Sequence, residues 1–228
     1  DISNQNKLSE FYEELKRLNV EITRPDINEC FADFRTVDNK FYYALGGIKA
    51  VGFEAISNVV KERTENGNFK SINDFLNRVN PKDMNKLQLE GLVKAGAFDS
   101  INNNRQSLFN SIPNFILKTK NMFENKSANQ IDLFSEDEST QDNIVNEIED
   151  WKFEERLSKE FEAVGFFISD HPLNQFTEIF DDYKIVDYSN FNLSDEIREA
   201  NIAATLLKVQ ERKTAKGNSY AVLKLTDL

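Results

Sequence analysis

The 228-residue sequence has few residues of the kinds that form disulfides and metal centres. Cys30 is its one cysteine and His171 its one histidine, so an internal disulfide and a cluster of His and Cys metal ligands are both excluded. A lone cysteine is typical of a reducing cytoplasm. No run of about 18 or more apolar residues occurs, which excludes a transmembrane helix within the sequence. We therefore expect a soluble, cytoplasmic protein that makes no membrane contact and holds no cofactor.

An initial methionine is also missing, because the sequence begins with Asp1. At the other end, a period of two residues appears only after Asn201, where "NIAATLLKV" and "SYAVLKL" flank the turn "TAKGN". This pattern predicts a β hairpin, and the residues that remain are too few to close a β domain. We interpret both observations as signs of a piece cut from a longer protein.

Positive charge is scarce overall, since the net charge is −11, but it is unevenly distributed. Residues 40–126 carry 13 Lys and Arg against 8 Asp and Glu, a net of +5. Residues 132–162 carry 3 against 12, a net of −9. Each block is either a solvated surface or has an electrostatic role, the basic block as a site for a polyanion and the acidic block as a neighbouring segment that avoids polyanions.

Apolar residues recur at helical spacing in most of the sequence, which predicts a mainly α-helical protein with a small β part. A short hairpin is expected around Asp38-Asn39, Gly67 suits a helix end, and Ser71 suits a helix start. Residues 124–150 are polar and acidic, which predicts a flexible linker. The predicted helices cover residues 7–18, 53–63 and 71–78, a stretch from Pro81 to near Ala95, and residues 103–123 and 153–164.

Two loops of small residues within the basic block each precede a helix: residues 46–52, the first corner, and residues 94–98, the second corner. Small residues let backbone N–H groups approach a ligand, and the following helix adds its free N–H groups and positive dipole end. This combination favours a phosphate. The alternative is that each glycine only caps a helix or lets helices pack closely. The candidate DNA-binding residues are Gly47, Ile48, Lys49, Ala50, Gly52, Lys94, Gly96, Ala97 and Arg105.

Contacts of this kind grip the DNA backbone and read no bases, so binding would be independent of sequence and sensitive to salt. Two corners about 45 residues apart also suggest one pseudo-symmetric unit that holds both strands.

Six stretches occur in a characteristic order: "PDIN" at residues 25–28, "ALGGIKAVG" at 44–52, "KLQLEGLVKAGAFDSI" at 86–101, "NNR" at 103–105, "GFFISDHPL" at 165–173 and "TAKGNSYAVLKLTD" at 214–227. Together they resemble the C-terminal half of the α subunit of bacterial DNA polymerase III, the replicative C-family polymerase. The resemblance covers essentially the whole sequence. One departure is Ala50, where many members of the family carry glycine.

The resemblance implies a domain order and a function. The catalytic aspartates of the family, which use Mg²⁺, lie in an upstream palm domain that is absent here, so we expect no catalysis from these residues. The terminal strands would begin an OB-fold near the single-stranded template, and other replicase subunits would be partners. The implied domains are residues 1–40, the end of a fingers-like region; 41–123, a tandem helix-hairpin-helix domain that holds duplex DNA; 124–150, the linker; 151–195, a helical continuation; and 196–228, the start of the incomplete OB-fold.

The predicted linker contains an apolar pair, Leu133-Phe134, in otherwise polar surroundings. In the family a short motif at this place binds the β sliding clamp, which implies that role for Gln130, Ile131, Asp132, Leu133 and Phe134. Leu133 and Phe134 are adjacent anchors for a partner's pocket, and Gln130 offers an amide that both donates and accepts hydrogen bonds. The alternative is that the pair folds back on helices of its own chain.

Two other functions fit the residues less well. One is a stand-alone adapter or DNA-repair protein that uses helix-hairpin-helix motifs and a clamp peptide; the other is a helical scaffold that binds no DNA. His171 has no accompanying nucleophile, so we expect it to stabilise a turn. Trp151, Phe153 and Phe161 are spaced for core packing rather than for base stacking.

Overall fold

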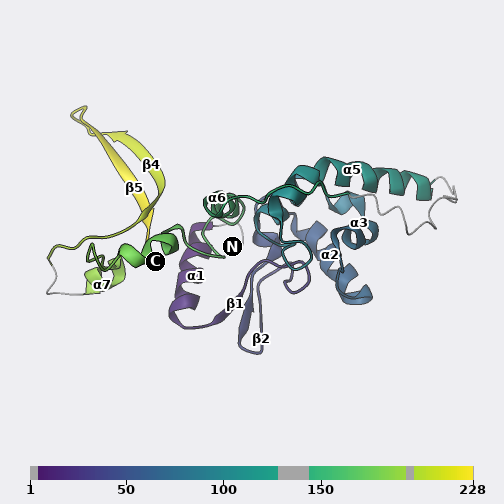
Figure 1. Cartoon of the computed structure of the whole chain (residues 1–228), viewed down its shortest axis with the longest axis horizontal. Coiled ribbons are helices and arrows are strands. Elements are labelled where there is room, and N and C mark those ends of the chain that lie inside the picture. Colours follow the sequence, from purple (N-terminus) through teal and green to yellow (C-terminus); the bar gives the residue numbers. More distant parts are fainter. Residues whose placement is uncertain (1–4, 128–143, 194–197, 228) are drawn as a thin grey trace. The chain divides into compact units, whose positions relative to one another are not determined.

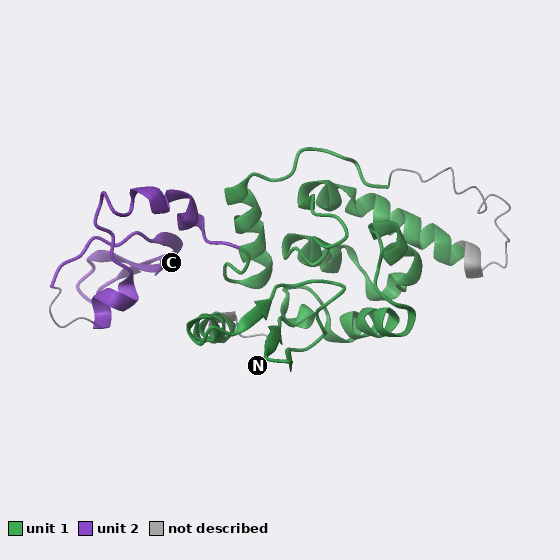
Figure 2. Cartoon of the chain, turned by 60° about the horizontal axis from the view of Figure 1, so that its bottom comes forward, with its two compact units in different colours: residues 1–169 green, residues 170–228 purple. Residues whose placement is uncertain are grey.

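The computed structural model describes residues 5–127, 144–193 and 198–227, which form two compact units, residues 1–169 and 170–228 (Figure 2). Figure 1 shows a mainly helical chain with two small sheets, so the predicted fold class is confirmed. The first unit contains α1 (Gln5–Arg17), β1 (Glu21–Thr23), β2 (Arg35–Val37), β3 (Lys40–Tyr42), the 3-10 turn η1 (Leu45–Gly47), α2 (Phe53–Asn66), α3 (Ile72–Arg78), η2 (Pro81–Asp83), α4 (Lys86–Lys94), α5 (Arg105–Ser127) and α6 (Phe153–Val164). The second contains η3 (Pro172–Ile179), α7 (Tyr188–Leu193), β4 (Thr205–Lys213) and β5 (Ser219–Thr226).

The sheet of the first unit has the strand order β1-β3-β2, with β1 parallel and β2 antiparallel to β3. The predicted hairpin is confirmed: Asp38 and Asn39 connect β2 to β3, and both have positive φ, of 49° and 62°, as a tight hairpin turn requires. The predicted domain boundary at residue 40 is wrong, because it cuts through this sheet.

Helix ends in the first unit follow the capping residues of the sequence. Gly67 follows α2 with a φ of 82°, and the Ser71 hydroxyl accepts a hydrogen bond from the Asp74 N–H at 3.1 Å, both at the predicted places. Pro81, however, opens only the 3-10 turn η2. The next helix, α4, begins at Lys86, where Asn85 and Gln88 form a reciprocal capping box that fixes its start.

Residues 144–150 lie along α5, which corrects the prediction of a linker over 124–150. The helix α5 itself extends to Ser127. The Asn146 N–H donates to the Ser111 hydroxyl, and the Ile148 N–H donates to the Ser107 hydroxyl, each at 2.9 Å. Two serine hydroxyls of α5 thus accept the N–H groups of this segment. The segment is therefore held against α5 as part of the first unit.

The second unit begins before the predicted boundary at residue 195, because η3 and α7 belong to it. The predicted hairpin is confirmed: β4 and β5 pair antiparallel across a turn in which Gly217 has a φ of 82°. The OB-fold that these strands would open remains a prediction. None of the described helices is long and apolar enough to cross a membrane.

Burial of hydroxyl and thiol groups in the first unit predicts a loss of stability at alkaline pH. Burial raises the pKa of the Cys30 thiol from 9.0 to about 12 and that of the Tyr12 hydroxyl from 10.0 to about 12, and it also raises the pKa of Tyr43. The unfolded chain therefore loses these protons first. Each group's contribution to the free energy of unfolding is fully present below its ordinary pKa. It is lost as pH rises through the pKa that the group has in the folded protein.

Urea titrations followed by the fluorescence of Trp151, the one tryptophan, should show a falling midpoint as pH rises from 9.0 to 10.0 and above. Trp151 is buried in the first unit against Phe109, so it reports on that unit. Cys30→Ala removes the contribution of the thiol, so the urea midpoint should fall less steeply with pH in this variant. A midpoint that does not change over this range would contradict the prediction.

Candidate nucleic-acid interface

The first corner connects η1 to α2 and has a buried half and an exposed half. Gly47 and Ile48 are buried, and their N–H groups donate to the Ala44 and Leu45 carbonyls at 2.9 and 3.3 Å. The prediction that Gly47 and Ile48 contact DNA is therefore wrong. Lys49, Ala50 and Gly52 are exposed, so the surface of this corner is limited to residues 49–52 and the start of α2.

Unpaired N–H groups gather on the exposed half. Within the described residues, the N–H groups of Ala50 and Gly52 have no acceptor. Gly52 is the N-cap of α2 and offers no side chain to cap it, so the N–H groups of residues 53–55 are free as well. The predicted signal was the glycine loop. The free first turn of α2 agrees with the expectation that the following helix adds its N–H groups, because Gly52 has no side chain to cap them.

Contacts with α4 and α6 hold the corner in place. The Lys49 N–H donates to the Ala163 carbonyl of α6 at 2.9 Å, so it is not available to a ligand. Gly91 of α4 faces the corner so closely that a Cβ there would lie 2.6 Å from the Lys49 carbonyl oxygen. Ala50 itself has a φ of 65°, a conformation that favours glycine. Packing therefore imposes on Ala50 a turn that glycine would adopt more readily.

Two charged side chains flank the free N–H groups. Lys49 is exposed and has no ion-pair partner among the described residues. Glu54 lies in the first turn of α2, where its carboxylate interacts favourably with the helix dipole. A phosphate at this place would gain from Lys49 and the amides and would be repelled by Glu54.

The second corner differs, because its N–H groups are used within the chain. The Gly96 and Ala97 N–H groups donate to the Val93 and Leu92 carbonyls at 3.0 and 2.9 Å, which ends α4. Gly96 has the expected positive φ of 77°. The alternative interpretation, a helix cap, is therefore correct for this corner, and the prediction that Gly96 and Ala97 bind phosphate is wrong.

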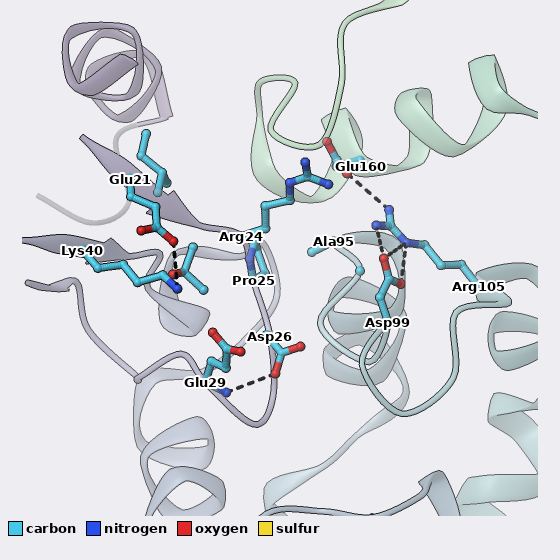
Figure 3. A pocket seen from close by; sticks show the side chains of 13 residues that line it. Glu21, Arg24, Pro25, Asp26, Glu29, Lys40, Ala95, Asp99, Arg105 and Glu160 are labelled. Atoms are coloured by element: carbon cyan, nitrogen blue, oxygen red, sulfur yellow. Dashed lines mark hydrogen bonds and ion pairs between the residues drawn. The ribbon is translucent and has the colours of Figure 1, made fainter. Parts of the chain in front are cut away.

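Arg105 covers the second corner and is not available to DNA (Figure 3). Its side chain is 4% exposed and pairs with Asp99 at 2.7 Å and with Glu160 of α6 at 3.3 Å. It also donates to the Lys94 carbonyl at 3.2 Å. A Cβ on Gly96 would lie 2.0 Å from a guanidinium nitrogen of Arg105, so the glycine makes room for this side chain. The prediction that Arg105 supplies positive charge to DNA is wrong.

A hollow of about 320 Å³ in front of the second corner has the wrong charge for a phosphate (Figure 3). Carboxylates outnumber cations in its lining. The carboxylates are Glu21, Asp26, Glu29, Asp99 and Glu160, and the cations are Arg24, Lys40 and Arg105. Because Lys40 already pairs with Glu21 at 2.9 Å, the excess of negative charge would repel a polyanion.

Lys94, the remaining predicted cation, is also engaged. Its ammonium group lies 2.9 Å from the Glu162 carboxylate, and this pairing lowers the pKa of Glu162. The same ammonium lies 5.5 Å from the centre of the Phe109 ring. The two corners therefore do not form a pseudo-symmetric pair of phosphate sites. Within the described residues, the free donors of the first corner lie on its exposed half, whereas the N–H group without an acceptor in the second corner belongs to the buried Phe98.

The remaining residues singled out in the sequence lie elsewhere in the chain. Residues 130–134, the predicted clamp motif, lie outside the described residues. The His171 ring nitrogen accepts from the Leu173 N–H at 3.2 Å, which confirms a turn-stabilising role. Trp151 is buried and Phe161 half-buried, as core packing requires, whereas Phe153 is 40% exposed. Within the described ranges, no group of three or more His, Cys, Asp and Glu could hold a metal ion.

Comparison with known proteins gives a family match and several relatives. Residues 19–108, which contain both corners and the helices between them, match the family described as a helix-hairpin-helix motif. DNA polymerase III subunit alpha of Caulobacter vibrioides is 31% identical over 100% of this chain and 20% of its own length. The same subunit of Borreliella burgdorferi is 35% identical over 80% of this chain and 16% of its own length. The same subunit of Campylobacter jejuni is 33% identical over 86% of this chain and 17% of its own length.

The chain thus spans about a fifth of the length of the curated relatives that it matches. Along its whole length it belongs with one region of the bacterial DNA polymerase III alpha subunits, a region that includes a helix-hairpin-helix segment.

Proposed function

We propose that this chain is the part of a replicative polymerase α subunit that grips duplex DNA, and that residues 49–52 and the first turn of α2 make the contact. The observation that supports it best is the uncapped start of α2 beside an exposed Lys49, within the segment that matches the helix-hairpin-helix family. Free N–H groups at a helix start bind phosphates, so the grip follows the DNA backbone and reads no sequence.

In this proposal the chain holds DNA and supplies no catalytic carboxylate, while polymerisation belongs to other parts of the α subunit. A stand-alone adapter or repair protein is less well supported, because the relatives that align with all or most of this chain are polymerase subunits. Contacts with single-stranded template through β4 and β5, and with other replicase subunits, remain predictions.

Lys49→Glu tests the phosphate site. Each Lys or Arg that neutralises a phosphate releases counterions, so losing one should reduce the slope of log affinity against log salt by about one unit. Fluorescence anisotropy with a labelled duplex at several salt concentrations measures this slope. Lys70→Glu is the matched control, because Lys70 is also an exposed lysine of the first unit but follows the end of α2, whereas the corner precedes its start. An unchanged slope for Lys49→Glu would contradict the site.

We further propose that residues 130–134 bind the sliding clamp. Burying Leu133 and Phe134 in a partner's pocket would contribute about 3–6 kcal/mol before ordering costs. Ordering the segment reduces this gain, so an affinity in the micromolar range, about −8 kcal/mol, is expected. Such an attachment is weak alone and effective when clamp and chain share one DNA molecule.

The double substitution Leu133→Ala with Phe134→Ala should abolish binding to the purified clamp and leave duplex affinity unchanged, because it removes both apolar anchors and no charge. Isothermal calorimetry measures the first and anisotropy the second. Clamp binding that survives the double substitution would show that the pair is not the anchor.

A further inference from the structure

An aromatic pocket lies next to the first corner. It has a volume of about 630 Å³, within the range of pockets that hold small organic groups. Its walls come from α1, from the β2–β3 hairpin and the residues before it, and from the start of α2. The aromatic side chains that matter most are those of Phe11, Phe34, Phe41, Tyr43 and Phe53.

Phe53 joins this pocket to the free N–H groups of the corner. It is the first residue of α2, so its N–H belongs to the proposed phosphate site while its ring lines the pocket. Gly46 keeps the ring in place: a Cβ on Gly46 would lie 3.2 Å from the Phe53 ring and 2.7 Å from the Ala32 carbonyl oxygen. A ligand that binds with a phosphate at the corner therefore has an aromatic cavity within one helical turn.

The Tyr43 hydroxyl does not open into this cavity. Tyr43 lines the pocket with its ring, but it is 1% exposed, and its buried hydroxyl lies beside Gly47, where a Cβ would be 3.4 Å from the oxygen. The pocket therefore offers its rings, and a ligand with a flat aromatic face would pack against them.

We propose that the pocket receives one unpaired nucleobase of the DNA held at the first corner, an inference that rests on the proposed duplex binding. A nucleobase is planar and aromatic and stacks on Phe side chains whatever its identity. Its own phosphate lies one sugar away, which matches the adjacency of the pocket and the N–H groups. Lys7 and Asp33, one residue of each charge, also line the pocket.

The experiment compares two labelled duplexes that differ only by one extrahelical adenine, with all 228 residues of this chain, in fluorescence anisotropy. Base–aromatic stacking predicts that the bulged duplex binds about tenfold more tightly than the paired one. Phe11→Ala removes an aromatic wall at a residue that is 67% exposed, so folding is spared. This variant should lose most of the preference and keep its affinity for the paired duplex.

Two matched variants separate stacking from general effects. Phe153→Ala truncates another exposed phenylalanine, 40% exposed and outside the pocket, and should keep the full preference. Tyr43→Phe retains the ring and removes only the buried hydroxyl, so it should also keep the preference.

The possible failures are distinguishable. If the wild-type protein binds paired and bulged duplexes equally, the pocket does not take a base, while the proposed duplex grip stands. If Phe11→Ala keeps the preference, the base lies elsewhere and the inference is overturned. If neither duplex binds at low salt, the proposed function itself fails, and the inference fails with it.

Discussion

Replacing Arg105 by alanine should lower the free energy of unfolding of the first unit by about 3–5 kcal/mol, the cost of breaking a buried ion pair from one side. The Glu160 carboxylate is fully buried, and its remaining oxygen accepts the Ile168 and Ser169 N–H groups at 2.9 and 2.8 Å. Without the guanidinium, this charge stays in a dry interior unpaired. The contact between Asp99 and α5 is lost as well.

Urea denaturation followed by Trp151 fluorescence measures this loss in the first unit. Arg17→Ala is the matched control: it removes an arginine from an ion pair with Glu14, but both side chains are largely exposed, so the free energy of unfolding should change little. Arg105→Lys keeps the charge and loses the planar fork, and should fall between the two. A similar stability for Arg105→Ala and Arg17→Ala would show that the buried network is not stabilising.

Gly52→Asp should weaken duplex binding by about tenfold or more while leaving the protein at least as stable as before, since charge-assisted hydrogen bonds are each worth about 1.5–3 kcal/mol. The backbone at position 52 has φ of −72° and ψ of 132°, which an N-cap aspartate adopts without strain. Its carboxylate would accept the free N–H groups of α2 and occupy the place of a phosphate. A Cβ there lies 3.2 Å from the amide nitrogen of Gln88, which must shift slightly while the amide oxygen keeps its hydrogen bond from the Asn85 N–H.

Gly52→Asn isolates the effect of charge in this experiment. It caps the same N–H groups with a neutral oxygen, so it should weaken binding less than Gly52→Asp, and the difference between the two should shrink as salt is raised. Thermal unfolding of each variant shows whether the cap has formed. Full duplex affinity in Gly52→Asp, together with a rise in stability, would remove the start of α2 from the DNA-binding surface.

The sequence predicted the first corner because its signal is local. A loop of small residues leading into an amphipathic helix produces free N–H groups wherever it occurs. What sequence reasoning missed is which donors stay free, because that depends on acceptors far along the chain. The Lys49 N–H is taken by Ala163, more than a hundred positions later, and no spacing rule reveals such a partner.

Arg105 shows why counting charges misled the prediction at the second corner. It was assigned to DNA because it lies in a basic block. Its partners are Asp99, six residues away, and Glu160, 55 residues away in the acidic block. A surplus of positive charge by segment says nothing about which cations are already neutralised inside the fold.

Residues 144–150 were predicted to be linker for a related reason. Composition measures whether a segment can form a core of its own, and this one cannot. It is held by hydroxyl groups on α5, with Ser107 and Ser111 spaced four residues apart along one side of the helix. Serines within a helix form no sequence pattern from which a contact with such a segment could be predicted.

The hydrogen bond from the Lys49 amide to Ala163 has a consequence for how the DNA grip is lost. It joins the turn that presents the free donors to the last residues of α6, while α6 is anchored through Glu160 to Arg105. Detachment of α6 would release that turn before α2 itself unravels. The protein would then let go of its phosphates through a partial opening, at a lower free energy than global unfolding.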